Sequence, residues 1–177
     1  MPMTAPTPDA TPAITLARLT PDREPAVEAL LDLAFGPARH GRTAYLVRGT
    51  VRAIPELGFA ALEDDRLIGS IQCWPIALTG DDGIVHPLVM LGPVAVEPGR
   101  QQAGIGRQLM ETTLAAAAAH RLDEAMMLIG DPEYYARFFG FSAERTARWR
   151  LPGPVERHRL LARGGRVPDV AGMLGPR

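Results

Sequence analysis

The chain has 177 residues, of which 46% are hydrophobic, and a formal net charge of -1 at pH 7. This length supports one well-buried core but is too short for two ordinary domains. All 19 basic residues are arginine and no long run of one sign occurs, so neither nucleic acid nor an anionic membrane is indicated as a partner. Cys73 is the only cysteine, and no stretch of about 20 apolar residues is present. We therefore expect a single domain in a reducing cytoplasm.

The N-terminal third predicts a leader, a strand and two helices. Residues 1–12 are rich in proline and are expected to be disordered. The sequence Ile14–Leu19 alternates as a strand does, and Thr20-Pro21-Asp22 signals the start of a helix that should end near Gly36-Pro37. A second, weaker helix is expected over Arg42–Ala53.

A meander of three strands should follow. The first two strands, Leu57–Leu62 and Leu67–Leu78, are separated by the turn residues Glu63–Arg66. The segment Thr79–Gly83 then connects the second strand to a third, which ends at Val96.

The next predicted elements are a long helix, a short strand and a short helix. The helix Gln102–His120 has apolar residues along one face, and Ala125–Ile129 reads as a short buried strand. Asp131 and Pro132 fit the N-cap and first position of a helix that ends before Gly140.

The C-terminal segment gives weaker signals. A strand is expected from Phe141 onward and a small helix over Pro154–Ala162. The segment Gly164–Arg177 reads as a loose tail. The whole order is β-α-α-β-β-β-α-β-α-β, which is an α/β arrangement.

The most informative segment is Leu91–Met110, where a strand passes through a polar loop into a helix. Gly104 and Gly106 have no Cβ, so a bulky anion could approach the backbone there. The free N–H groups and the positive dipole end of the following helix would favour phosphate. An isolated G-x-G is more often a turn that simply begins a helix, so the rest of the chain must decide.

Two familiar phosphate-binding motifs do not fit this segment. A Rossmann fingerprint places its glycines directly after a strand, but here seven residues separate Val96 from Gly104, and Leu109 occupies the third glycine position. A P-loop requires lysine, which this chain lacks.

Two motifs carry a resemblance to a known family. The residues Gln101–Gly106, preceded by Val94–Val96, resemble the Q-x-x-G-x-G motif A of the GNAT superfamily of N-acetyltransferases. The run Gly130–Phe141 resembles that of the YhbS-like branch, with one extra phenylalanine before Gly140. The resemblance spans roughly Ile14 to Leu161. It implies the GNAT acyl-CoA N-acyltransferase fold, with a mixed, mostly antiparallel central sheet and flanking helices, as a single domain over residues 13–163.

The resemblance also implies acetyl-CoA as cofactor, with CoA as product and no metal. Its pyrophosphate would lie on the N–H groups of the motif, with Arg107 or Arg100 nearby. The Val94 N–H would donate to the thioester oxygen at a bulge, a position with which Pro93 is consistent. The implied cofactor-binding residues are Val94, Ala95, Val96, Gln101, Gln102, Ala103, Gly104, Ile105, Gly106 and Arg107.

Acyl transfer to an amine needs a proton donor for the leaving thiolate. By resemblance this is Tyr135, with Tyr134 as the alternative, because the extra phenylalanine leaves open which of them faces the thiol. A tyrosine pKa of about 10 against about 8.5 for a thiol keeps the donor protonated at neutral pH without driving the transfer strongly. Both tyrosines could instead simply pack the short helix on the sheet.

The base and the acceptor are less defined. Some relatives have a glutamate four residues before the thioester position, where this chain has Met90. His86 and Glu97 are alternatives, although a strand histidine and a solvated glutamate are both common without any catalytic role. Five arginines are expected near the acceptor entrance, where they would suit a carboxylate or phosphate on the amine. Because every basic residue is an arginine, surface arginines are expected anywhere, and chance placement is the stronger interpretation. The five arginines are Arg39, Arg42, Arg145, Arg148 and Arg150.

Two functions remain open at this point. The first is an N-acetyltransferase that transfers acetyl from acetyl-CoA to a primary amine of a small molecule or protein, by direct attack in a ternary complex. The second is a non-catalytic acyl-CoA-binding regulatory module of the same fold. The acceptor, the acyl-chain preference and the choice between monomer and homodimer are not determined.

Overall fold

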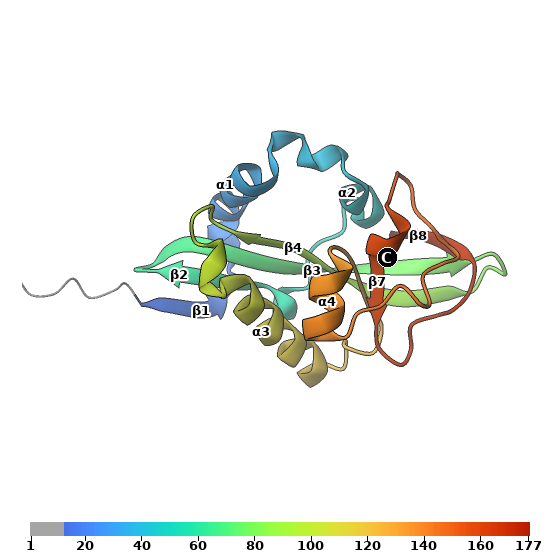
Figure 1. Cartoon of the computed structure of the whole chain (residues 1–177). Coiled ribbons are helices and arrows are strands. Elements are labelled where there is room, and N and C mark those ends of the chain that lie inside the picture. The colour runs from blue at the N-terminus through green and yellow to red at the C-terminus, as the bar shows by residue number, and fades with distance from the viewer. Residues whose placement is uncertain (1–12) are drawn as a thin grey trace, which may run out of the picture.

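A computed structural model describes residues 13–177, which form an eight-stranded sheet with helices on both faces (Figure 1). The strand order is β1-β2-β3-β4-β5-β7, and β8 pairs with both β3 and β6. Most neighbours are antiparallel, while β4–β5 and β6–β8 are parallel. The predicted mixed sheet with flanking helices is confirmed. The predicted leader lies outside the described residues.

The N-terminal elements match the sequence pattern closely. They are β1 (Ile14–Arg18), α1 (Glu24–Phe35), α2 (Thr43–Arg48), β2 (Phe59–Glu63) and β3 (Arg66–Gly80). Helix α2 is shorter than expected, because it already ends at Gly49, whose φ is 54°. A positive φ of this kind is a common helix stop.

The motif-bearing elements also lie where the sequence places them. They are β4 (Val85–Val96), α3 (Ile105–Ala119), β5 (Met126–Ile129) and α4 (Pro132–Phe139). The side chain of Asp131 accepts a hydrogen bond from the Glu133 N–H at 3.1 Å, which confirms the predicted N-cap of α4.

The C-terminal predictions need correction. After Phe141 the chain forms only an isolated bridge between Ser142 and Ala162, not a strand. The predicted helix over Pro154–Ala162 is wrong, since a single 3-10 turn leads into β7 there. The loose tail is wrong as well, because it contains β8. The three strands of this region are β6 (Trp149–Arg150), β7 (Leu160–Arg163) and β8 (Gly172–Pro176).

The open edge of β3 explains why the tail is ordered. Strand β2 pairs with only the first half of β3, up to Ile71, and β8 pairs with the second half, Ile76–Gly80. Pairing satisfies backbone groups that would otherwise form a free edge. Leu174 of β8 is 1% exposed and packs in the core beside β3.

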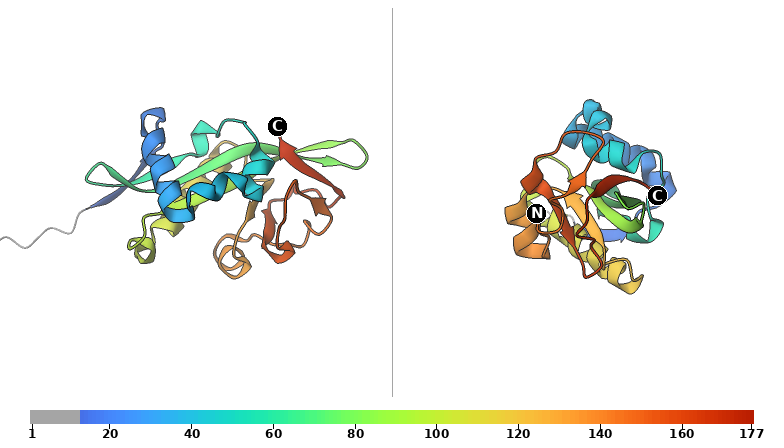
Figure 2. Two further views of the ribbon diagram at one scale, coloured as in Figure 1. Left: turned by 90° about the horizontal axis from the view of Figure 1, so that it is seen from above. Right: turned by 90° about the vertical axis from the view of Figure 1, so that its right-hand side faces the viewer.

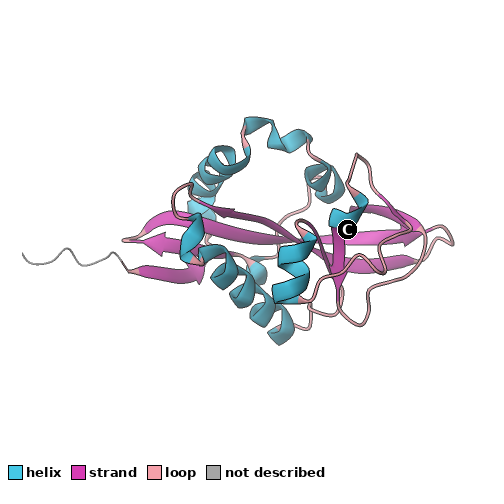
Figure 3. Cartoon of the chain, viewed as in Figure 1, coloured by secondary structure: helices cyan, strands magenta, loops and turns pink. Residues whose placement is uncertain are grey.

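The helices divide between the two faces of the sheet. Figures 1 and 2 show α1 and α2 on one face and α3 and α4 on the other, and Figure 3 shows the sheet between them. Side chains alternate accordingly: Val89 and Leu91 pack on the α3 side, whereas Leu88 and Met90 pack on the α2 side.

A bulge in β4 reverses this alternation. Leu91 pairs with Cys73 and Val94 pairs with Ile71, so two residues of β4 lie opposite one residue of β3. After the bulge it is Val94 and Val96 that face α3. The bulge that Pro93 was expected to mark is therefore present.

The β8 pairing predicts a large difference between two adjacent substitutions. Leu174→Ala should lower the free energy of unfolding by about 2–5 kcal/mol, because it leaves a cavity in the core. Met173→Ala is the matched control, since the Met173 side chain is 42% exposed. Urea unfolding measures both, and equal small losses would contradict the packing of β8.

Candidate active site

Strands β4 and β5 part after a short stretch of pairing. They pair only at Val89–Met126 and Met90–Met127. Beyond these pairs, β4 stays bonded to β3 and β5 stays bonded to β7. Beyond these two pairs, the facing edges of β4 and β5 therefore do not hydrogen-bond to each other.

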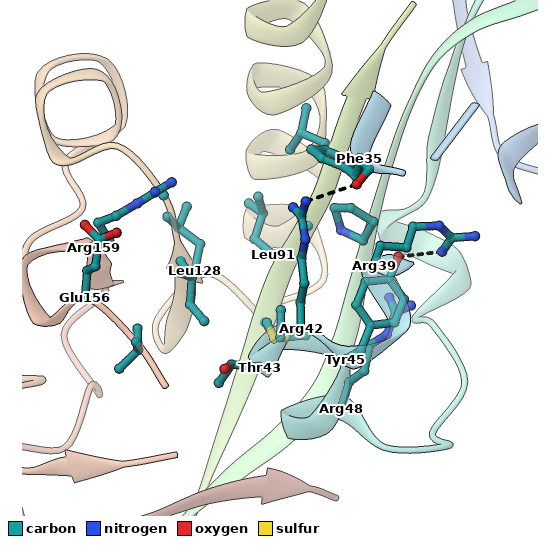
Figure 4. Close-up of a pocket in the computed structure, with 18 of the residues that line it drawn as sticks. Phe35, Arg39, Arg42, Thr43, Tyr45, Arg48, Leu91, Leu128, Glu156 and Arg159 are labelled. Atoms are coloured by element: carbon teal, nitrogen blue, oxygen red, sulfur yellow. Dashed lines mark hydrogen bonds between the residues drawn. The ribbon is translucent and has the colours of Figure 1, made fainter. Parts of the chain in front are cut away.

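A cavity of about 770 Å³ lies where the strands part. Its size falls within the range of small-molecule sites. Its wall combines residues from α4 on one face of the sheet with residues around α2 on the other, and Figure 4 shows Arg42, Tyr45 and Arg48 across from Glu156 and Arg159. The strand residues in the wall are Met90, Leu91, Gly92, Pro93, Val94, Leu128 and Ile129.

The β4 bulge lies in this wall and is held by a tryptophan of β3. Gly92 has a φ of 111°, a conformation that residues with a Cβ rarely adopt. The Trp74 indole N–H donates to the Gly92 carbonyl oxygen at 2.7 Å. The backbone around Val94 is therefore fixed on the cavity side of the sheet.

Both tyrosines of α4 line the cavity, so its geometry does not choose between the two candidates that the motif left open. Tyr135 packs against Phe139 and Phe141, and burial raises its pKa to about 12. Tyr134 contacts the Tyr135 ring, and burial raises its pKa as well. Both side chains are therefore protonated at neutral pH.

The glycine before α4 has a steric role that the motif alone did not reveal. A Cβ at Gly130 would lie 2.3 Å from Cε2 of Tyr135. Any larger residue there would force the tyrosine ring to move. Gly130 thus leaves the space that the Tyr135 ring occupies at the cavity.

The N-terminus of α3 is free to bind an anion. Gly104 precedes the helix with a φ of 73°, no side chain caps the first turn, and that turn contains no acidic residue. Unpaired N–H groups at such a helix start attract negative charge. Arg107 lies in this turn, is 4.9 Å from the Phe138 ring centroid and pairs with Glu111 at 2.8 Å, whereas Arg100 is bound to Glu63.

The predicted cofactor residues form two groups. Val94 lines the cavity with the tyrosines. The others are not in the cavity wall: Ala95 and Val96 are buried in the sheet, and Gln101–Arg107 lie at the start of α3, where residues 101–104 are exposed. The contact between Arg107 and Phe138 places this start beside α4.

Neither candidate base is part of the cavity. His86 lines a separate cavity of about 360 Å³ near the start of β4. Glu97 is bound to Arg66 at 2.6 Å, and this arginine lowers its pKa. Met90 does line the main cavity, but it cannot accept a proton.

Of the five arginines expected at the acceptor entrance, two line the cavity. Arg39 is 1% exposed and joins α1 to the segment before α2 through ion pairs with Asp32, at 2.8 Å, and Glu28. Arg42 donates to the Phe35 carbonyl oxygen at 3.0 Å.

The other three arginines do not line the cavity, because each side chain is bound to a partner in another part of the structure. Arg145 donates to the Val167 carbonyl oxygen, Arg148 pairs with Asp169, and Arg150 pairs with Asp81. Asp81 lies in the turn between β3 and β4. Val167 and Asp169 lie in the segment before β8, which the sequence predicted to be part of a loose tail.

The sequence reasoning missed Tyr45, Arg48 and Arg159, which all line the cavity. Tyr45 and Arg48 are three residues apart on a predicted helix, a spacing that places them on one face, so this signal was available. Arg159 had no such signal, because its position depends on a turn that was predicted as helix.

The sequence matches one family model over residues 24–141, and that model describes the GNAT acetyltransferase family. The chain belongs to this family. Among curated proteins, none matches the sequence.

Solved GNAT structures share the fold. The YhbS N-acetyltransferase of Escherichia coli, in complex with CoA, superposes with a TM-score of 0.71 at 22% identity, covering 97% of this chain and 93% of its own. A GNAT acetyltransferase from Brucella melitensis, in complex with acetyl-CoA, gives a TM-score of 0.58 at 24% identity, covering 86% of this chain and 96% of its own. At these identities the likeness establishes the fold alone. Within residues 13–177, no helix is both long enough and apolar enough to cross a membrane.

The raised pKa of Tyr135 predicts a loss of stability at high pH. The unfolded chain loses this proton near pH 10, while the folded chain keeps it to about 12. The free energy of unfolding should therefore fall between these values, by at most about 2–3 kcal/mol, and Tyr135→Phe should flatten the fall.

Chemical denaturation from pH 9 to 11.5 measures this slope. Tyr134→Phe is the comparison and should flatten the fall less, because the Tyr134 hydroxyl is less buried and its pKa is raised less. Cys73, whose pKa burial also raises to about 12, contributes equally to every variant. A slope that Tyr135→Phe leaves unchanged would contradict the buried position of its hydroxyl.

Proposed function

We propose that the protein is an acetyl-CoA-dependent N-acetyltransferase, which transfers an acetyl group to a primary amine by direct attack in a ternary complex. The observation that carries this proposal is the cavity between β4 and β5, lined by α4 from one face and α2 from the other. Such a passage lets a thioester and an amine meet from opposite sides. The CoA and acetyl-CoA complexes of the E. coli and Brucella relatives support the choice of donor.

The residues present fit acetyl-CoA. The loop Gln101–Gly106 and the start of α3 offer N–H groups for the pyrophosphate, with Arg107 beside them, although the Ala103 N–H already donates to the Arg100 carbonyl oxygen. The open edge of β4 after Met90 offers Val94–Val96 to the pantetheine arm as if it were an added strand. When bound, the cofactor supplies an activated acetyl group.

Polarisation of the thioester carbonyl falls to the Val94 N–H. A bulge removes backbone groups from the regular ladder, so the backbone here is free to face a ligand. The bond from Trp74 to Gly92 fixes this segment before any ligand binds. A preorganised donor stabilises developing negative charge without reorganisation.

Tyr135 is the proposed proton donor to the departing thiolate, with Tyr134 as the alternative. Both line the cavity and both have raised pKa values, so each carries its proton at neutral pH. Tyr135 is favoured because its ring occupies the space that Gly130 leaves and packs against Phe141. The amine proton leaves through solvent or through an acceptor group that the substrate itself brings.

The alternative is a non-catalytic acyl-CoA-binding module of the same fold. Its supporting observation is that neither His86 nor Glu97 lines the cavity. Both functions require CoA binding, so turnover separates them.

Gly104→Val should weaken CoA binding at least tenfold. The added side chain strains a residue with a φ of 73° and occupies the open space in which the proposed pyrophosphate would lie. Gly83→Val is the matched control, because Gly83 has a φ of 82°, equally open surroundings and a place in the distant β3–β4 turn. Calorimetric titration with CoA decides; equal affinities of the two variants would contradict the proposed pyrophosphate site.

Tyr135→Phe should lower kcat by about 100-fold, at the modest end of general-acid effects, while KM for acetyl-CoA stays within about twofold. Thiol release from acetyl-CoA with a panel of amines measures both constants. A larger loss in Tyr134→Phe would move the role to Tyr134. CoA binding without release for any amine would favour the binding module.

A further inference from the structure

The cavity wall contains a buried arginine between two aromatic rings. Arg48 is 8% exposed, and its Cζ lies 3.7 Å from the Trp74 ring centroid and 3.9 Å from that of Tyr45. None of the ion pairs formed by residues 13–177 includes Arg48. Arg39, on the same wall, is neutralised by Glu28 and Asp32.

A buried guanidinium without a carboxylate is costly. The two ring faces compensate part of the lost hydration through cation–π attraction, and Tyr45 and Glu28 also favour the charged form, but burial outweighs them and Arg48 forms no ion pair among the described residues. Burial accordingly lowers the pKa of Arg48, although an arginine stays charged at neutral pH. The pocket around Arg48 is therefore suited to an anion.

The two rings also select the shape of the anion. With both faces of the guanidinium covered, only its planar edge of N–H donors remains for a ligand. This edge matches the two coplanar oxygens of a carboxylate in a bidentate pair. Arg48 lines the cavity, so a small acceptor entering there can reach it.

The rest of the wall has a positive balance. Arg42 and Arg159 also line the cavity, and Arg159 lies across it from Arg48. Asp131 is engaged in capping α4, and Glu156 lies 3.5 Å from His158. Within the described chain, the cavity thus offers more positive than negative charge to a ligand.

Trp74 connects this arginine to the proposed reaction centre. Its ring stacks on Arg48, and its N–H binds Gly92, two residues before Val94. One side chain, Trp74, therefore contacts both Arg48 and the bulge. One small molecule with an amine and a carboxylate can occupy both places within the cavity.

We propose that the acceptor is a small amine that also carries a carboxylate, and that Arg48 binds this carboxylate through its N–H edge between Tyr45 and Trp74. This inference rests on the proposed N-acetyltransferase function. Arg48 is then a specificity-determining residue, whose loss impairs carboxylate-bearing acceptors and leaves CoA binding intact.

Calorimetric titration of N-acetyl-L-amino acids and of their neutral carboxamides tests the proposal on the CoA-saturated protein. At least one carboxylate form should bind tenfold or more tightly than its carboxamide. Arg48→Met should abolish this preference, and Arg48→Lys should retain part of it. Arg52→Met is the matched control, because Arg52 is exposed and outside the cavity wall.

Two results would overturn the inference: no carboxylate preference in the unmodified protein, or a preference that survives in Arg48→Met. O-phosphoethanolamine serves as a further probe, and tighter, Arg48-dependent binding of this phosphate would replace the carboxylate by a phosphate. Thermal unfolding verifies that each variant is folded. CoA titration of the same proteins tests the proposed function separately, and repeating the carboxylate titrations without CoA keeps the two outcomes distinct.

Discussion

The short pairing between β4 and β5 is the constraint on which the site depends. Two parallel strands would normally continue side by side until one of them ends. Here β4 bulges at Gly92-Pro93 directly after its second pair with β5, and the two strands then follow different neighbours. The same parting opens the cavity and exposes an edge of β4. It also lets helices from opposite faces of the sheet contribute to one wall.

The hydrogen bonds of one buried arginine, Arg39, hold the α2 side of the cavity wall. Arg39 joins Glu28 and Asp32 of α1 to Tyr45 of α2 by buried or half-buried hydrogen bonds. Removing one partner of a buried ion pair costs far more than an exposed pair contributes, because the remaining charge stays desolvated. The position of Tyr45, and with it one face of the Arg48 pocket, thus depends on α1.

The sequence predicted the elements up to α4 because local signals define them. The Asp131-Pro132 start, the glycine at the end of α4 and the apolar face of α3 are all written within a few residues. Val94 and the two tyrosines were placed by motif spacing, and they do line one cavity. Their chemical roles remain proposals.

The failures have a different physical origin. The strand β8 forms because β3 has an open edge far away in the sequence, and no local pattern at Gly172–Pro176 records that edge. Arg145 and Arg148 were misplaced for the same reason, since their partners Val167 and Asp169 lie in the segment before β8. Trp74 gave no signal either, because its two contacts, Arg48 and Gly92, come from α2 and β4.

The pairing of β8 with β3 has a consequence for synthesis on the ribosome. Paired residues Leu78 and Leu174 lie more than half the chain apart, and α2 rests on β8. Until β8 emerges, the second half of β3 has no partner on the edge that β8 will occupy. Helix α2 also lacks the strand against which it packs. The sheet can complete its α2 side only after β8 has left the exit tunnel. Formation of the α2 side of the sheet thereby depends on the strand that is synthesised after all the other described elements.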